Sequence, residues 1–351
     1  MILNVIAIVI LATEIANSFV LIKNRLRQIF AAVIFMHNIL TCVEDYNTIY
    51  ILVRNFGGYI MSQKERRRMG DRKDAKLIRK IDGMHLIVPL IHPNRCDNEA
   101  FVSERIELDA INKYLEKLNA NNPEFKYTLF HIIVTAILRC FTLRPQMNRF
   151  IANNSLYEKN EISAAFVIKK QFADEAREGL AIVRADENTN LESVHESIRH
   201  QVMDCRKGKV DASSNVMDIL TKFPRPITRM IGSIARYLDQ KGKLPSSIIA
   251  TDPYHSSVVL SNLGSIKLRS GYHHLTNWGT NSVFVIVGEK KMRPVFKEDG
   301  TFEMKDTVDL GLTVDERIAD GYYFSKTIKL LKKLLESPEL LEQPAITPVE
   351  Y

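Results

Sequence analysis

The sequence is poor in cysteine and tryptophan. Its 351 residues include four cysteines and one tryptophan. Cys42, Cys96, Cys140 and Cys205 are scattered and form no Cys-x-x-Cys pair. This spacing excludes a disulfide-rich scaffold and argues against a structural zinc site. We therefore expect a reducing compartment, predict a cytoplasmic location, and predict no metal cofactor.

Long uninterrupted apolar runs are also absent. The first run, Ile2–Ala12, is shorter than the roughly 20 residues that cross a bilayer, and Glu14 interrupts its continuation. A secretory signal fits poorly, because no Lys or Arg precedes this run. Residues 1–60 form an apolar extension with three interpretations. It is an upstream mis-start, a weak membrane segment through residues 1–40, or an added helical hairpin. The first interpretation rests on Met61, which opens a polar segment like an ordinary protein start.

Positive charge is concentrated in one short segment. The net charge is +7, and nine Lys/Arg against three Asp/Glu place +6 of it between Met61 and Lys80. The rest is nearly neutral, which excludes a broad nucleic-acid surface, so we expect no nucleic-acid partner. Residues 61–82 form a basic leader. It is either a solvated segment or a local contact for an acidic partner, RNA or anionic lipid.

From residue 83 onward, helical and strand patterns alternate within what we predict to be one domain, residues 83–345. The segment Thr128–Phe141 is apolar almost all round, which predicts a central buried helix. Strands are predicted at Phe101–Leu108, Ser163–Lys169, Leu180–Arg184, Ser257–Ser261 and Val283–Val287. Because helices and strands mix and several strands cluster late, the predicted class is α+β with a mixed sheet.

The clearest pattern lies near the C-terminus. Residues 308–314 alternate apolar and polar side chains, which predicts a half-buried strand. A helix with one apolar face follows and ends at Pro338. The seven residues Asp315–Gly321 connect the two, at a strand end where folds commonly present reactive groups.

This strand, loop and helix resemble a catalytic motif of two related families. The families are the catalytic domain of the 2-oxoacid dehydrogenase dihydrolipoamide acyltransferases and chloramphenicol acetyltransferase. Their motif is His-x-x-x-Asp-Gly, which this chain matches at Asp320-Gly321 and, for the Arg after the His, at Arg317. Glu316 occupies the His position. Val258–Gly264 resembles the family's Thr-Ile-Ser-Asn-Leu-Gly stretch, and the likeness covers roughly residues 83–342.

The resemblance implies a fold, an activity and partners. The fold is the chloramphenicol-acetyltransferase-like two-layer sandwich of a mixed sheet and helices, assembled as a homotrimer. The activity is transfer of an acyl group between coenzyme A and a thiol, hydroxyl or amine acceptor, with acyl-CoA as a substrate. No covalently attached lipoyl group is expected, because the lipoyl domain of the complex enzymes is missing. The small-molecule donor and acceptor are the expected partners, with a 2-oxoacid dehydrogenase complex as a further candidate.

The resemblance also implies residue roles. Ser261 matches the hydroxyl that stabilises the oxyanion and reaches the base across a trimer interface. Glu316 stands in the general-base position. Asp320 shapes the loop and pairs with an arginine, for which Arg95 is the candidate. Supporting positions are Arg317, Asn262 and Gly321.

Alternatives remain open at the base position. In a closed tunnel a carboxylate at Glu316 would have a raised pKa and act as the base. If Glu316 instead pairs with Arg317 or another cation, the protein is an inactive, repurposed trimeric scaffold. A third option is a substitute base at His273 or His274. A metal site at this histidine pair is disfavoured, because neighbouring residues on a strand point to opposite faces.

Overall fold

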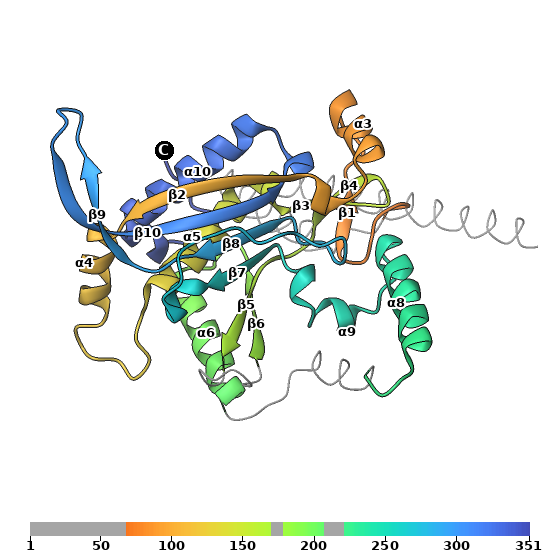
Figure 1. Ribbon diagram of the computed structural model, residues 1–351, viewed down its shortest axis with the longest axis horizontal. Helices are drawn as coiled ribbons and strands as arrows, with labels where there is room; N and C mark the ends of the chain where they lie inside the picture. The colour runs from red at the N-terminus through yellow and green to blue at the C-terminus, as the bar shows by residue number, and fades with distance from the viewer. Residues whose placement is uncertain (1–67, 170–177, 207–220) are drawn as a thin grey trace, which may run out of the picture. The chain divides into compact units, whose positions relative to one another are not determined.

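The computed structural model describes residues 68–169, 178–206 and 221–351 (Figure 1). The apolar extension 1–60, and residues 61–67 of the basic leader, lie outside the described residues. Residues 67–351 form one compact unit, which therefore extends N-terminal to residue 83. Within the described ranges, no helix combines the length and apolar character needed to cross a membrane.

A seven-stranded sheet organises the unit. Its strands are β2 (Glu99–Glu107), β5 (Ile162–Lys169), β6 (Glu178–Ala185), β7 (Val258–Asn262), β8 (Val283–Val287), β9 (Lys291–Phe296) and β10 (Phe302–Asp315). The order is β2-β10-β8-β7-β5-β6, and β9 pairs with β10. The pairs β5–β7 and β7–β8 are parallel, whereas the other pairs are antiparallel. The predicted mixed sheet is confirmed.

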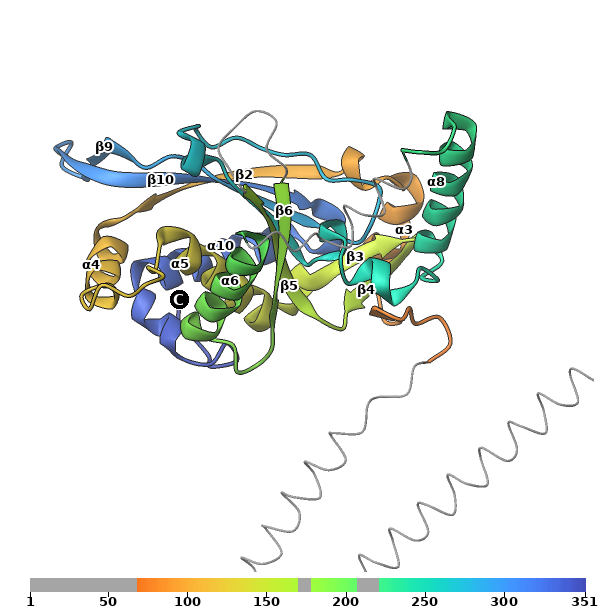
Figure 2. The ribbon, with the colours of Figure 1, turned by 90° about the horizontal axis from the view of Figure 1, so that it is seen from below.

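Four helices cover one face of this sheet (Figure 2). They are α4 (Asp109–Leu118), α5 (Leu129–Leu143), α6 (Leu191–Arg206) and α10 (Gly321–Glu336). The predicted central helix is α5, and its side chains pack with those of β8 and β10 in one apolar core. Even Arg139 of α5 is buried, because its guanidinium donates to the carbonyls of Leu340 and Thr347. The two-layer α+β sandwich is confirmed.

Part of the second face of the sheet, over β8 and the end of β10, is covered by coil rather than by solvent. A Cβ added at Gly311 of β10 would lie 1.9 Å from the carbonyl oxygen of Gly271. Thr313, two residues further along the same face, is wholly buried. The half-buried strand predicted at residues 308–314 is therefore wrong for its polar face. The alternation correctly predicted the strand, but a segment distant in the sequence covers its polar face.

A smaller sheet and three further helices complete the described structure. The sheet has the order β1-β4-β3 and was not predicted, because its strands are three to five residues long. Its strands are β1 (Ala75–Leu77), β3 (Arg149–Ala152) and β4 (Ser155–Lys159), and the helices are α3 (Gly83–Ile91), α8 (Arg225–Gln240) and α9 (Ser246–Ile249). Pro224 precedes α8 and Pro226 stands in its first turn, positions at which proline favours a helix start.

Candidate functional site

The motif loop is a short 3₁₀ turn, Glu316–Ile318, between β10 and α10. Its internal ion pair joins Arg317 to Asp315: Nε lies 2.7 Å from Oδ1, and Nη2 lies 2.7 Å from Oδ2. The remaining guanidinium nitrogen, Nη1, donates to the carbonyl of His92 at 2.8 Å. Arg317 is thereby directed away from Glu316. The pairing of Glu316 with Arg317, one of the two pairings that the scaffold alternative named, is not formed.

Glu316 itself points to solvent. Its backbone nitrogen donates to the carbonyl of Asn98 at 3.0 Å, which fixes the loop. Its side chain is exposed and has no hydrogen-bond or ion-pair partner in the described part of the chain. The described residues of a single copy therefore do not enclose this carboxylate in a tunnel.

Arg95 and Asp320 do not form the expected pair. The buried Arg95 guanidinium faces Asp315, with Nε 3.7 Å from Oδ2, and donates to the carbonyls of Thr276 at 2.8 Å and Gly279 at 3.1 Å. Burial lowers the pKa of Arg95 to about 10, against the opposing effect of Asp315. The expectation that Arg95 pairs with Asp320 is wrong in this geometry, because Asp315 lies nearer to it.

Asp320 caps α10. Its Oδ1 accepts from the backbone nitrogen of Tyr323 at 2.7 Å, which satisfies one of the free donors of the first helical turn. Gly321 is the first residue of the helix. The Asp-Gly pair thus sets where α10 begins and, with it, the end of the motif loop.

Ser261 lies near the end of β7. It is half-buried, and its hydroxyl has no partner among the described residues. The next residue, Asn262, accepts from the backbone nitrogen of Ser265 at 3.2 Å and so fixes the turn. A Cβ at Gly264 would lie 2.4 Å from the carbonyl oxygen of Gly288, which explains why this turn uses glycine.

The register of the sheet separates Ser261 from Glu316. Val314 of β10 pairs with Val283 of β8, which pairs with Val258 of β7. Ser261 lies three residues beyond this level, and Glu316 lies two residues beyond it in the opposite direction, because β10 is antiparallel to β8. Five residues of strand amount to roughly 17 Å along the strands. One chain therefore does not bring these two side chains together.

The histidine pair stacks rather than diverging. The rings of His273 and His274 lie 4.6 Å apart at 26°, and His273 also stacks on Phe284 at 4.2 Å. The expectation of opposite faces is wrong, because this segment is coil. Phe284 pairs with Val259, two residues before Ser261 on the same face. Within the ranges that the structure describes, no cluster of three or more His, Cys, Asp or Glu is placed to hold a metal ion.

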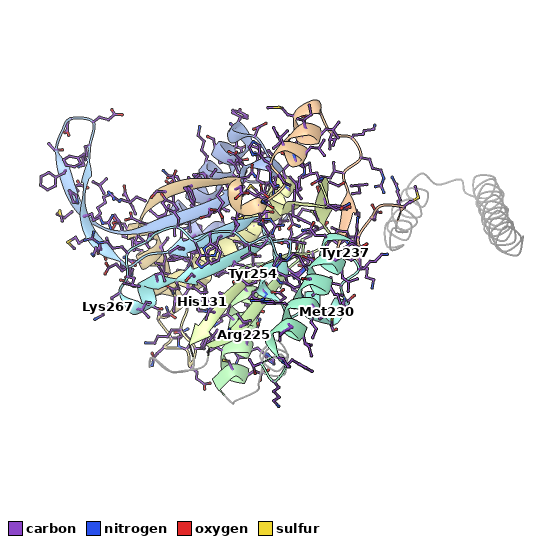
Figure 3. The ribbon with its side chains drawn as sticks, turned by 45° about the vertical axis from the view of Figure 1, so that its right-hand side comes forward. His131, Arg225, Met230, Tyr237, Tyr254 and Lys267 are labelled. Atoms are coloured by element: carbon purple, nitrogen blue, oxygen red, sulfur yellow. The ribbon has the colours of Figure 1, made fainter. Side chains whose placement is uncertain are left out.

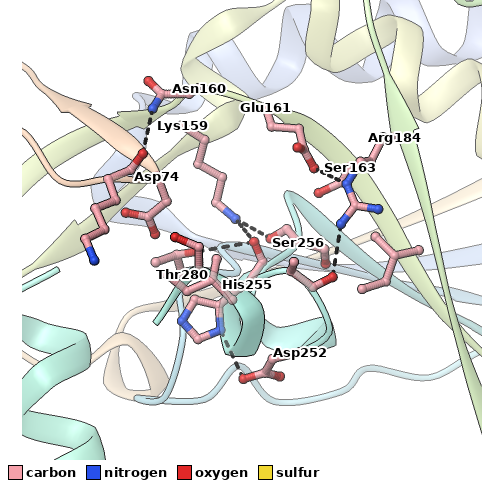
Figure 4. Close-up of a pocket in the computed structure, with 15 residues that line it drawn as sticks. Asp74, Lys159, Asn160, Glu161, Ser163, Arg184, Asp252, His255, Ser256 and Thr280 are labelled. Atoms are coloured by element: carbon pink, nitrogen blue, oxygen red, sulfur yellow. Dashed lines mark hydrogen bonds and ion pairs between the residues drawn. The ribbon is translucent and has the colours of Figure 1, made fainter. Parts of the chain in front are cut away.

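A cavity of about 270 Å³ lies elsewhere in the unit (Figure 4). It is lined by residues of β4, β5 and β6, by the segment 246–256 and by Thr280, and it includes neither Ser261 nor Glu316. Lys159 lines it and donates through Nζ to the carbonyls of His255 at 2.7 Å and Ser256 at 2.5 Å. Burial lowers the pKa of Lys159 to about 7. No sequence pattern pointed to this lysine.

His255 is held between two carboxylates beside this cavity. Its Nε2 lies 3.1 Å from Asp239 Oδ1, and its Nδ1 lies 3.0 Å from Asp252 Oδ2. Burial lowers the pKa of His255, but the two carboxylates more than offset this and raise it above its ordinary value. Since both ring nitrogens are engaged, His255 is not free to act as a base.

Comparison with known proteins supports the resemblance. The family model described as 2-oxoacid dehydrogenases acyltransferase (catalytic domain) matches residues 240–342, which include Ser261, Glu316 and Asp320. No curated protein sequence matches the chain. The resemblance inferred from the sequence is thus confirmed for this C-terminal portion, which holds both motifs.

Solved structures share the fold. The dihydrolipoamide acetyltransferase of Azotobacter vinelandii has 14% identity and a TM-score of 0.51, over 75% of this chain and 93% of that one. The cubic core of a pyruvate dehydrogenase multienzyme complex has 15% identity and a TM-score of 0.50, over the same shares. Chloramphenicol acetyltransferase has 12% identity and a TM-score of 0.45, over 74% and 99%. The first two of these likenesses confirm the predicted fold class. In the Azotobacter enzyme, a serine, a histidine and an asparagine have been studied for their role in the catalytic mechanism.

Proposed function

We propose that the protein is an acyltransferase that moves an acyl group between coenzyme A and a thiol, hydroxyl or amine acceptor. We propose further that it works as a homotrimer whose site is shared between copies. The observation that carries the proposal is the placement of the two motif residues. Ser261 and Glu316 stand at opposite ends of the sheet, so a site that uses both must join two chains.

The proposed reaction needs two groups. The lone pair of the acceptor attacks the thioester carbonyl carbon, and Glu316 of one copy accepts the proton that the acceptor loses. The hydroxyl of Ser261 of the next copy donates a hydrogen bond to the oxyanion of the tetrahedral intermediate. The bond from carbon to the sulfur of coenzyme A then breaks, and the proton held by Glu316 passes to that sulfur. Ser261 has a hydroxyl free for this role within the described part of the chain.

The loop around Glu316 is built to hold it rigidly. The ion pair of Asp315 with Arg317 is completely buried, and Arg95 adds a second cation at 3.7 Å from Asp315. A carboxylate that faces water is a poor base for a thiol. Covering Glu316 with a second copy would remove water from the carboxylate and so strengthen it as a general base.

The hairpin of β9 and β10 offers a surface for assembly. It projects at the left edge of Figure 1, and one of its faces carries four exposed apolar side chains. They are Met292, Phe296, Phe302 and Met304. Charged side chains elsewhere on the hairpin form ion pairs, such as that of Lys297 with Glu303. Exposed apolar side chains gathered on a projecting hairpin fit a contact between protein chains, which supports the homotrimer.

A second candidate is an inactive, repurposed trimeric scaffold that binds coenzyme A or a 2-oxoacid dehydrogenase complex. The observation that favours it is the exposed Glu316 carboxylate in the position where the related families have histidine. Fold likeness alone does not transfer catalysis. The two candidates differ in whether any thioester is turned over.

The test is release of free thiol from a panel of acyl-CoAs by the full chain, with dihydrolipoamide, a simple alcohol and a simple amine as acceptors. We expect turnover in the native protein and its loss in Glu316→Gln. Glu336→Gln is the matched control, since Glu336 is an exposed glutamate at the end of α10. Turnover that survives Glu316→Gln would direct the search to His273 and His274. Binding of coenzyme A without turnover would favour the scaffold.

A further inference from the structure

Helix α8 turns an apolar stripe away from the rest of the unit. Ile227, Met230, Ile234 and Tyr237 follow one another at spacings of three, four and three residues, which places them on one helical face. Their exposed fractions are 39%, 57%, 52% and 62%. Met230 and Tyr237 can be followed along the helix in Figure 3. Within the described ranges, this stripe is not covered by the protein's own chain.

Every exposed charge on and beside α8 is positive. Between residues 221 and 245, the sequence holds six cations and one carboxylate. The cations are all exposed: Lys222, Arg225, Arg229, Arg236, Lys241 and Lys243. The carboxylate is that of Asp239, which is buried and paired with Arg72 and His255. The exposed charges that α8 and its flanking residues carry are thus all positive.

The C-terminal end of α8 is fixed to the unit, so the orientation of the stripe is set. The carbonyl of Asp239 accepts from Arg72 at 2.6 Å, and its side chain accepts from the backbone nitrogen of Gly279 at 2.9 Å. Ile231 and Leu238 are half-buried on the inner side of the helix. The exposed stripe therefore lies on the outer part of an anchored helix.

We propose that α8 docks on the surface of an anionic phospholipid bilayer. The apolar stripe would enter the boundary between headgroups and acyl chains, and the arginines and lysines would contact lipid phosphates, as basic amphipathic helices do. A second copy fits this face less well, because a symmetric contact would bring together two helices whose exposed charges are all positive. This proposal is independent of the proposed acyltransferase activity.

Hydrogen exchange of the full chain tests the proposal at α8 itself. The apolar runs of residues 1–60 offer a separate route to lipid, so a local readout is required. Exchange of amides within residues 225–240 is measured without vesicles, with phosphatidylcholine vesicles, and with vesicles that also contain phosphatidylglycerol. We expect slower exchange in this segment only with the anionic vesicles, and a loss of this effect at high salt.

Two variants separate the charge from the apolar contribution. Arg229→Glu/Arg236→Glu reverses two cations and should lower the partition coefficient on anionic vesicles by more than about tenfold, given that each basic residue contributes on the order of a fivefold factor. Met230→Ser/Ile234→Ser removes apolar area at constant charge and should abolish the local protection. Lys113→Glu/Lys117→Glu on α4 changes the net charge equally at another exposed site and should leave the protection intact. Circular dichroism confirms that each variant is folded.

Three results would overturn the proposal. Equal protection of residues 225–240 on neutral and anionic vesicles would remove the role of charge. Protection in the absence of vesicles, increasing with protein concentration, would mean that another copy covers the stripe. An equal loss of protection in the α4 control variant would show that the effect depends only on the net charge of the protein.

Discussion

The guanidinium of Arg317 binds both carboxylate oxygens of Asp315, with two nitrogen–oxygen distances of 2.7 Å. Both side chains are fully buried, and Arg95 lies 3.7 Å from the same carboxylate. Asp315 therefore compensates two buried cations at once. Asp315, the last residue of β10, therefore holds the motif loop in place. It directly precedes the segment that resembles the catalytic motif.

Replacing Asp315 with Asn should destabilise the protein severely. The change leaves Arg317 buried without a counter-charge and removes the nearest carboxylate from Arg95, and breaking a buried ion pair in this way costs about 3–5 kcal/mol. Urea unfolding followed by circular dichroism measures the loss. Glu303→Gln, on the same strand but in an exposed pair with Lys297, is the control and should leave the free energy of unfolding nearly unchanged. Similar losses in both variants would contradict the role of burial.

Asp320→Ala should have a smaller, local effect. It removes the side chain that accepts from Tyr323 at the start of α10, and loss of such a cap costs about 1 kcal/mol. Asp320→Asn keeps a capping oxygen, so its free energy of unfolding should fall by only a few tenths of a kcal/mol. Urea unfolding of the two variants side by side provides the measurement. An equally stable Ala variant would show that the cap does not support the helix.

The sequence was sufficient where the signal was local. The alternation of residues 308–314 predicted β10 and the apolar stripe predicted α10, and both are present. These features depend on residues within a few positions of one another. Pattern reasoning works there because the period of apolar residues belongs to a single element.

The sequence was insufficient where the partner is distant. Thr313 was expected on a polar face, but coil near Gly271 buries that face. Arg95 was assigned to Asp320, whereas the fold places it beside Asp315. The cavity around Lys159 is assembled from several strands and a loop nearly a hundred residues away in the sequence. No sequence pattern marks a lysine whose pKa is lowered to about 7 by burial. Such relationships depend on the tertiary arrangement of whole elements rather than on local periodicity.

His131 should make stability fall as the solution becomes acidic. Its ring lies buried against Phe125 and His195, Nδ1 accepts from the backbone nitrogen of Thr128 at 3.0 Å, and Nε2 has no partner among the described residues. Burial, aided by His195, lowers its pKa from 6.5 to about 4. The unfolded chain therefore binds the proton more tightly than the folded chain. The stabilisation is complete above pH 6.5 and is lost between pH 6.5 and 4, by about 3 kcal/mol in total.

The pH dependence of urea unfolding checks this sign and range. His131→Gln removes the titrating ring, so its free energy of unfolding should fall less than that of the native protein between pH 6.5 and 4. His200→Gln, on an exposed histidine of α6, controls for the loss of a histidine as such and should leave the native profile unchanged. Parallel profiles for the native protein and His131→Gln would exclude His131 as the cause.

Mixed oligomers should recover activity that each single variant lacks. If Ser261 and Glu316 act from different copies, then Ser261→Ala and Glu316→Gln are each inactive alone, because every site in the homotrimer lacks one group. In a mixed trimer, one of the three interfaces joins an intact Ser261 to an intact Glu316. Random mixing of equal amounts should therefore restore about a quarter of the native thiol release, by the cyclic symmetry of the assembly.

Coexpression of the two variants, with different affinity tags, isolates the mixed trimers for this measurement. The double variant Ser261→Ala/Glu316→Gln, mixed with the native protein, is the control, since it contributes no intact group to any interface. Recovery in the mixture of single variants, and no gain when the double variant is mixed with the native protein, requires a site built by two chains. A mixture as inactive as its components would place the catalytic groups within one chain. The search would then turn to His273, whose ring lies on the same face of the sheet as Ser261.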